Sequence, residues 1–183
     1  GSAPAQINVP RDYWTQLIDI ELPPIVRLER QAGGATAIEE AAQLLSNAKF
    51  PVILSGAGVV IGGAIKDCVK LAEKLDSPVC SGYQHNDSFP GSHPLAVGPL
   101  GYNGSKAAME LIAKADVVLA LGTRLNPFST LPGYGIDYWP KNAKIIQVDI
   151  NSDRIGLTKK VTVAICGDAK LVSQQLLAKL SPK

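Results

Sequence analysis

The sequence has few of the residues on which metal and nucleophilic chemistry depend. It contains two histidines and three cysteines in 183 residues, and Cys68, Cys80 and Cys166 stand far apart with no CxxC pair. No carboxylate or cysteine stands at metal-ligand spacing from His85 or His93, so we interpret both as loop residues. A nucleophile elbow is also missing. We therefore expect no metal site, no catalytic residue, and the reduced, buried thiols typical of a cytoplasmic protein.

The sequence also lacks a strong charge bias and a long apolar run. The formal net charge is +2, and lysines and arginines are scattered rather than clustered. This distribution gives no basic face for a nucleic acid. No apolar stretch approaches the roughly 20 residues of a membrane span, and no signal peptide opens the chain. We expect no nucleic-acid or membrane partner, and a small ligand instead.

The most informative stretch that is present is PVILSGAGVVIGG, residues 51–63. A short apolar run followed by Gly56-Ala57-Gly58 predicts a buried parallel strand, a tight turn and a helix. Glycines without a Cβ let a phosphate approach the backbone N–H groups of such a turn, and Gly62 lets the helix pack closely. The same pattern also fits a tight turn that binds nothing, so by itself it leaves both interpretations open.

Strands and helices alternate along the rest of the chain. A chain of this length with 46% hydrophobic residues is long enough for one α/β domain. We expect a helix that Thr36 opens with Glu39 as a capping box. The full pattern predicts strands at 51–55, 78–81, 116–121, 144–150 and 161–166, helices at 36–48, 64–75, 105–112 and 168–180, and long loops at 82–104 and 126–142. It indicates a Rossmann-like three-layer sandwich with a mostly parallel sheet of five to six strands.

The first 35 residues differ in character from the rest. Gly1-Ser2 is typical of a cloning scar, and the strand-like run at residues 3–10 is typical of the end of a preceding domain. We therefore assign residues 1–12 to that scar and tail, 13–35 to a linker, and 36–183 to the central domain. We expect the linker to lie over the domain surface, with Tyr13 and Trp14 as its anchors.

Several polar residues follow the predicted strands, and in a parallel sheet all of these positions meet at one edge. Arg124 has the planar fork that suits a phosphate, although a surface arginine is an alternative. Asp149 suits a ribose diol, or caps the following turn. Asp168 is a candidate ligand or a helix N-cap. Since Cys80-Ser81 supplies no acidic residue at the end of the second strand, we do not expect a standard NAD site.

With these features in place, the chain resembles the central domain of thiamine-diphosphate-dependent enzymes of the acetolactate synthase and oxalyl-CoA decarboxylase group. The segments that carry the resemblance occur in the family's order over nearly the whole chain: residues 5–12, 51–58, 89–94, 98–101, 115–124 and 148–150. The resemblance implies that this domain binds FAD or ADP, or has lost the site. The implied contacts are Gly56, Ala57, Gly58, Gly122, Thr123, Arg124, Asp149, Ile150 and Asp168.

The resemblance also implies that the catalytic apparatus lies outside this chain. In the family, thiamine diphosphate and Mg²⁺ are bound by a pyrimidine-binding and a pyrophosphate-binding domain, the second with a Gly-Asp-Gly segment. This chain has no such segment, since Gly167-Asp168-Ala169 leads into a helix. The domain would be inactive alone, and its partners would be the other two domains of the same chain, in a homo-oligomer.

Two loops narrow the resemblance further. Residues 84–89 and 126–140 are similar to the branch of the family that transfers an acetyl group from sulfoacetaldehyde to phosphate, releasing sulfite. In the second loop, Tyr134, Tyr138 and Trp139 form either its folded core or an interface anchor. The alternatives are the central domain of an acetolactate synthase-like enzyme, a free-standing FAD, ADP or NAD module, and a structural subunit of a larger complex.

Overall fold

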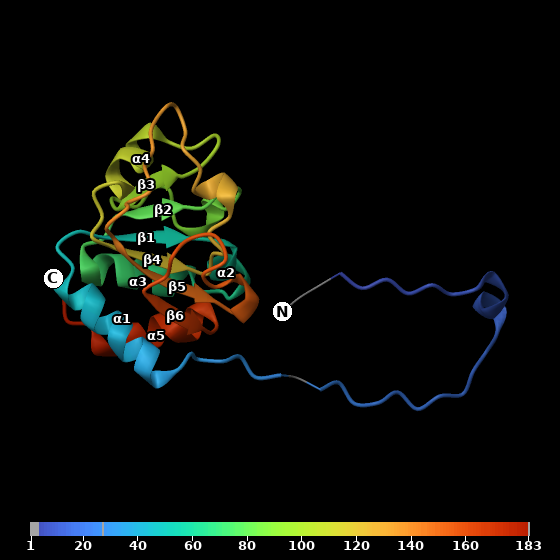
Figure 1. Cartoon of the computed structure of the whole chain (residues 1–183). Coiled ribbons are helices and arrows are strands. Elements are labelled where there is room, and N and C mark those ends of the chain that lie inside the picture. The colour runs from blue at the N-terminus through green and yellow to red at the C-terminus, as the bar shows by residue number, and fades with distance from the viewer. Residues whose placement is uncertain (1–3, 27, 183) are drawn as a thin grey trace.

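Six parallel strands form the centre of the molecule in a computed structural model, which describes residues 4–26 and 28–182. The strands are β1 (Pro51–Ser55), β2 (Val79–Ser81), β3 (Ala96–Pro99), β4 (Val117–Leu121), β5 (Lys144–Asp149) and β6 (Val163–Cys166). They are arranged in the order β3-β2-β1-β4-β5-β6 (Figure 1). The predicted Rossmann-like α/β fold is therefore confirmed, because this is the doubly wound order of dinucleotide-binding sheets.

The helices cover the two faces of the sheet unequally. Helices α1 (Ala35–Asn47), α3 (Ile65–Leu75) and α5 (Ala169–Lys179) share one buried cluster with the sheet, whereas α4 (Lys106–Ile112) belongs to the other. The short helix α2 (Ala57–Ile61) follows β1, and four 3-10 turns occupy residues 11–15, 86–88, 127–129 and 152–154. Among the described residues, no helix is long and apolar enough to cross a bilayer.

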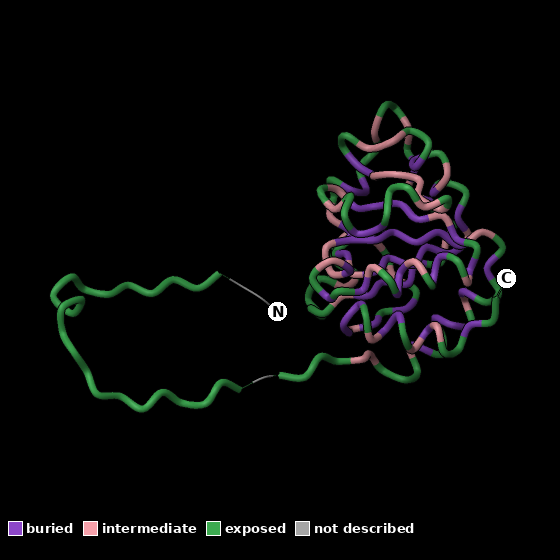
Figure 2. The backbone as a smooth tube through the Cα atoms, turned by 180° about the vertical axis from the view of Figure 1, so that it is seen from behind, coloured by how far each residue is buried: buried purple, intermediate pink, exposed green. Residues whose placement is uncertain are grey.

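Alternation along each strand builds the two cores. Ile53 of β1 lies in the cluster with α1, α3 and α5, while Val52 and Leu54 lie in the cluster with α4. Neighbouring side chains point to opposite faces of a strand, and both faces of the sheet are covered here, so most strand residues are apolar. Figure 2 shows these strands as the buried centre of the domain.

One expected feature of the helices is wrong. Helix α1 begins at Ala35 after Gly34, and no side chain caps it, so Thr36 and Glu39 do not form a capping box. The connections from β4 to β5 and from β5 to β6 are loops with 3-10 turns, and the first of them contains the long loop expected at 126–142. By contrast, Ser105 caps α4 as expected, accepting from the backbone N–H of Ala108.

The predicted loop at 82–104 contains a strand that the sequence did not indicate. Strand β3 pairs with β2, with a register irregularity between Val79 and Cys80. It was missed because it is short, half-buried and ends in Gly98-Pro99, residues that disfavour strands. Pro99 is tolerated here because β3 is an edge strand whose outer side needs no hydrogen-bonded partner.

The segment before the domain does not behave as expected. Residues 4–26 and 28–29, called the arm below, extend away from the domain (Figures 1 and 2), and the described part contains no strand. Tyr13 and Trp14 are exposed, so they do not anchor the segment to the domain. A single strand needs a partner to form a ladder, and this one has none. The interpretation of Gly1-Ser2 as a scar lies outside the described residues.

Candidate functional site

The strand order reverses between β1 and β4, and the loops that follow these strands diverge there. In open parallel sheets this switch point, at the carboxyl edge, is where ligands bind. The predicted site residues follow β1, β4, β5 and β6, so the topology brings all of them to this edge. How each group is used there is decided by its hydrogen bonds and burial.

The glycines after β1 and β4 pack against each other. The Gly58 amide donates to the Gly122 carbonyl at 2.8 Å, and the Gly56 amide donates to the Leu121 carbonyl at 3.1 Å. A Cβ on Gly58 would lie 2.7 Å from the Gly122 Cα, and Gly122 itself has a φ of +60°. These glycines therefore allow two turns to touch, and two of the amides expected to hold a phosphate are bonded to the chain instead.

Thr123 and Arg124 continue the turn after β4. Thr123 is buried; its Oγ1 accepts from the Leu125 amide at 3.2 Å. Arg124 is exposed and makes no ion pair with the described part of the chain. Ala57 is half-buried at the first position of α2. Arg124 is thus a cation available to an anionic ligand at this edge.

A buried glutamine that sequence reasoning missed holds this edge together. The Gln147 amide nitrogen donates to the carbonyls of Thr123 and Arg154, each at 3.1 Å, and its oxygen accepts from the Gly156 amide at 2.9 Å. Since buried polar groups need partners, these bonds fix the loops after β4 and β5 relative to each other. The signal was a single polar residue in the apolar run Ile145-Ile146-Gln147-Val148.

Asp149 and Ile150 lie at the end of β5. Asp149 Oδ1 accepts from the Asn151 amide at 2.9 Å, which is the turn-capping role that the sequence left open. The residue is half-buried, and a ribose would have to share this carboxylate with the turn. The Ile150 side chain is exposed at the same edge.

Asp168 acts as the N-cap of α5, the alternative that the sequence left open. Its Oδ1 accepts from the amides of Lys170 and Leu171 at 3.0 and 3.2 Å. Its Oδ2 pairs with Arg30 at 3.0 Å, and Arg30 also donates to the Gly62 carbonyl at 3.1 Å. Asp168 therefore ties residue 30 to the domain, and its lone pairs are used within the chain. Arg30 was missed because it lies in the predicted linker, which shows no periodic pattern.

The loop after β4 is built around a buried tyrosine. Tyr138 is fully buried and donates its hydroxyl to the Ser129 carbonyl at 3.0 Å, and burial raises its pKa to about 12. The Ser129 hydroxyl accepts from the Tyr83 amide at 2.8 Å, which joins this loop to the loop after β2. Tyr138 thus belongs to the folded core of the loop, whereas Tyr134 is exposed and Trp139 half-buried.

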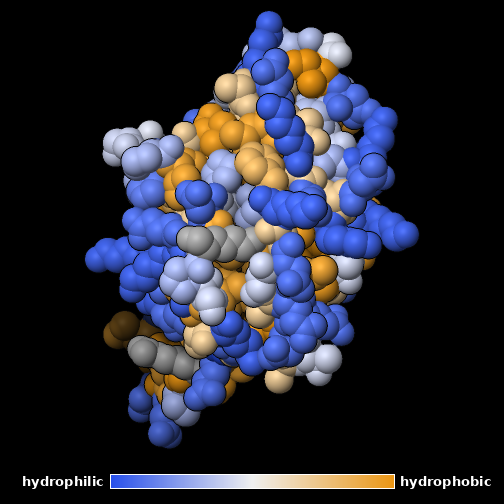
Figure 3. Space-filling view, turned by 90° about the vertical axis from the view of Figure 1, so that its left-hand side faces the viewer, coloured by the Kyte–Doolittle hydropathy of each residue, from blue (hydrophilic) through white to orange (hydrophobic). Residues whose placement is uncertain are grey.

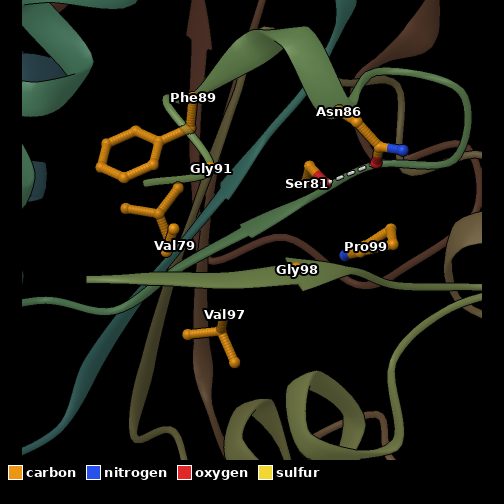
Figure 4. A pocket seen from close by; sticks show the side chains of 9 residues that line it. Val79, Ser81, Asn86, Phe89, Gly91, Val97, Gly98 and Pro99 are labelled. Atoms are coloured by element: carbon orange, nitrogen blue, oxygen red, sulfur yellow. Dashed lines mark hydrogen bonds between the residues drawn. The ribbon is translucent and has the colours of Figure 1, made fainter. Parts of the chain in front are cut away.

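A cavity of about 290 Å³ lies beside β2 and β3. It is separate from the switch point between β1 and β4, which is called the crevice below. Figure 4 shows Val79 and Phe89 together on one side of it, and the Ser81 hydroxyl bonded to the Asn86 side chain at 3.1 Å on the other. Apart from that pair its lining is mainly apolar, and it contains no ionisable side chain. It has no charged group with which to hold a phosphate.

The histidines are loop residues, as predicted, but of the three thiols expected to be buried, Cys166 is only half-buried. His93 Nε2 lies 3.3 Å from Glu73 Oε1, and His85 is a loop residue. No group of three potential metal ligands occurs in residues 4–26 and 28–182. All three cysteines are free, and burial raises the pKa of the Cys68 and Cys80 thiols to about 12.

The crevice fits a phosphate cradle poorly. Arg124 is available, but Gly56, Gly58 and Asp168 are engaged within the chain, and Asp149 is partly engaged. The assignment of FAD or ADP to these residues therefore stays a prediction. In the described part of the chain, Arg124 is a cation without an ion pair, and Asp149 is a shared carboxylate, beside a packed glycine turn.

Comparison with known proteins identifies the relatives of this domain. Residues 38–176 match the family model for the thiamine pyrophosphate enzyme central domain. The chain is 79% identical over 182 residues to a probable sulfoacetaldehyde acetyltransferase of Rhizobium meliloti (strain 1021), covering all of this chain and 31% of that protein. It is 76% identical to a sulfoacetaldehyde acetyltransferase of Roseovarius nubinhibens, covering 98% of this chain and 30% of that protein. A probable acetolactate synthase large subunit of Methanocaldococcus jannaschii is 39% identical, over 97% of this chain and 31% of that protein.

Solved structures agree on the fold. Benzoylformate decarboxylase from Polynucleobacter necessarius superposes with a TM-score of 0.75 at 23% identity, covering 94% of this chain and 32% of that one. A putative thiamin diphosphate-dependent enzyme from Mycobacterium smegmatis superposes with a TM-score of 0.72 at 26% identity, covering 88% of this chain and 31% of that one. The chain spans about a third of the length of these relatives. It belongs to the family of thiamine pyrophosphate enzyme central domains.

Proposed function

We propose that this chain is the central domain of a cytoplasmic, thiamine-diphosphate- and Mg²⁺-dependent sulfoacetaldehyde acetyltransferase. The complete enzyme would convert sulfoacetaldehyde and phosphate to acetyl phosphate and sulfite. The observation that carries the proposal is a gap in identity: five relatives with this name are 54 to 79% identical, against 39% for a probable acetolactate synthase large subunit. Divergence of that size within one fold suits a difference in substrate.

The part that this chain plays is structural. Its described residues contain no metal-ligand cluster, and the groups at the carboxyl edge of the sheet are largely bonded to one another. Thiamine diphosphate would supply the carbanion chemistry from the other two domains. The hydrogen bonds of Gln147 and Tyr138 would hold the long loops rigid against those domains.

The exposed apolar residues of the arm support the proposal that this domain is part of a larger protein. Eleven of its large apolar side chains are exposed, with Leu17, Leu28 and Ile25 among the most exposed. Exposed apolar residues gathered in this way mark a contact surface. We infer that the arm packs on the preceding pyrimidine-binding domain of the same polypeptide, and that the enzyme is a homo-oligomer.

An activity assay on the complete protein tests the substrate. With thiamine diphosphate, Mg²⁺, sulfoacetaldehyde and phosphate we expect stoichiometric release of sulfite and acetyl phosphate. The matched control replaces sulfoacetaldehyde by pyruvate. Acetolactate formation without sulfite release would refute the proposal and favour the acetolactate synthase-like alternative.

A thermal-shift titration of this chain tests the nucleotide alternative separately. A ligand that binds the native state raises the melting midpoint by mass action. A saturable shift with FAD, ADP or NAD that is lost in Arg124→Ala would support a live crevice. No shift with any of them, in a chain whose complete enzyme is active, would establish a purely structural domain.

A further inference from the structure

A second cavity lies at the opposite edge of the sheet, where β5 and β6 begin. It has a volume of about 430 Å³, within the range of sites for small molecules. Its walls come from the end of the loop after β4 and from the segment before β6: Trp139, Pro140, Lys141, Asn142, Ala143, Lys144, Ile145, Thr158, Lys159, Lys160 and Thr162. Figure 3 looks onto this amino edge, where hydrophilic side chains surround a smaller apolar area.

The charge of this groove is of one sign. Four lysines line it, and no carboxylate does. Lys141 pairs with Asp137 at 3.0 Å, but both side chains are largely exposed, so solvent screens that pair. Asp116, at the start of the adjacent β4, has its carboxylate occupied by the amides of Lys49 and Phe50. Lys144, Lys159 and Lys160 make no ion pair within the described chain.

An aromatic wall stands beside these ammonium groups. The Lys159 Nζ lies 5.1 Å from the centre of the Trp139 ring, a cation–π distance. Trp139 follows the fully buried Tyr138 and precedes the buried Pro140, so the backbone on both sides of it is fixed. The indole therefore presents an apolar surface next to a cationic one.

The floor of the groove is held by hydrogen bonds. The Thr162 amide donates to the Ile145 carbonyl at 2.8 Å, and its hydroxyl accepts from the Ile145 amide at 3.2 Å. The Thr158 hydroxyl donates to the Leu125 carbonyl at 2.7 Å. The segment that carries Lys159 and Lys160 is thus tied at both ends, and the two ammonium groups project from a fixed backbone.

We propose that this groove is a binding site for a compact multivalent anion of the phosphate class. Like charges gathered on a fixed backbone repel one another, and an anion with several phosphate oxygens relieves that repulsion while it accepts from several ammonium groups. Trp139 contacts the uncharged part of the ligand. This site is separate from the crevice between β1 and β4, since it lies at the other end of the strands.

The fluorescence of Trp139 reports directly on the proposal. The chain contains two tryptophans, and Trp14→Phe in the exposed arm leaves Trp139 as the single one. Titration of this variant with inorganic triphosphate is expected to give a saturable change, absent with sodium chloride at equal ionic strength. An identical change with the chloride, or no saturation, would overturn the proposal.

Lysine variants locate the site. Lys159→Ala with Lys160→Ala is expected to weaken triphosphate binding by about tenfold or more, because two ammonium groups that can donate to the phosphate oxygens are removed. The matched control is Lys66→Ala with Lys70→Ala on α3, which removes the same charge from another exposed face. Equal loss in both double variants would show non-specific attraction and refute the site.

Two further binding measurements test the contact with Trp139 and show whether the anion binds in the groove or in the crevice between β1 and β4. ADP is expected to bind more tightly than pyrophosphate, because its base or ribose adds contact with Trp139; equal affinity would refute that contact. Arg124→Ala is expected to leave the Trp139 signal unchanged. If Arg124→Ala abolished it, the anion would belong to the crevice and the proposed groove would be wrong.

Discussion

The arm and the domain are both rich in large apolar residues, yet they use them in opposite ways. Leu17 of the arm is 101% exposed, whereas Leu119 in β4 is 0% exposed. The difference lies in what surrounds each residue. Leu119 sits on a strand between two paired neighbours with helices over its face, while Leu17 has no packed element beside it. An apolar residue stabilises a protein only where tertiary structure covers it.

The sharpest test of this comparison is a matched pair of truncations. Leu119→Ala is expected to lower the free energy of unfolding by about 3 kcal/mol, through lost burial and a cavity in the core. Leu17→Ala is expected to change it by less than about 0.5 kcal/mol, because the side chain is already in solvent. Urea unfolding of both variants measures the difference. A loss of more than about 1 kcal/mol for Leu17→Ala would show that the arm packs on the domain.

A pair of glycine substitutions tests how much the close backbone contacts between loops of the domain contribute to its stability. Gly101 has a φ of +100°, and a Cβ there would lie 1.9 Å from the Phe128 carbonyl oxygen. Gly101→Ala is therefore expected to cost about 1–3 kcal/mol. The control Gly91→Ala meets no atom within 4 Å and should be close to neutral. Equal melting midpoints for both variants would contradict the tight contact between these loops.

The junction between arm and domain is tested at Asp168. Asp168→Ala removes the N-cap of α5 and the partner of Arg30, and we expect a loss of about 1 kcal/mol. Arg30→Ala leaves the cap in place and should cost less, since its side chain is half exposed. Thermal unfolding of the two variants decides between them. A larger loss for Arg30→Ala would mean that the ion pair, and not the cap, is the main contribution.

The smallest expected effect depends on pH. Burial of the Asp116 carboxyl acts to raise its pKa, but the amides of Lys49 and Phe50 outweigh it and the pKa is lowered. Because the pKa of the carboxyl is lower in the folded state, its ionised form stabilises the folded state at pH values above the unfolded-state pKa of about 4. This stabilisation is lost as the pH falls through the pKa of the folded state. Asp116→Asn should therefore lower stability at pH 7, and the difference from the parent chain should shrink as the pH falls through the lowered pKa of the folded state. A difference that is constant with pH would exclude this linkage.

Local patterns in the sequence determined the central strands. The apolar runs of β1, β4, β5 and β6 and the spacing of α3 and α5 need only their own residues to be recognised, because burial on both faces makes a strand continuously apolar. Ser105 and Asp168 were identifiable as caps for the same reason: each acts on amides two or three residues away. The doubly wound fold follows from the alternation of such elements.

Tertiary structure alone decided the features that depend on distant residues. Strand β3 exists because β2 offers it a partner, and no local pattern in Ala96–Pro99 shows this. The amides of Gly56 and Gly58 were expected to face a phosphate, but they bond to the end of β4, some 65 residues away in sequence. The arm, in turn, was expected to lie over the domain surface as a linker, because its sequence has several prolines and no sustained periodicity. Whether an apolar segment is buried depends on what packs against it, and a linear sequence does not contain that geometry.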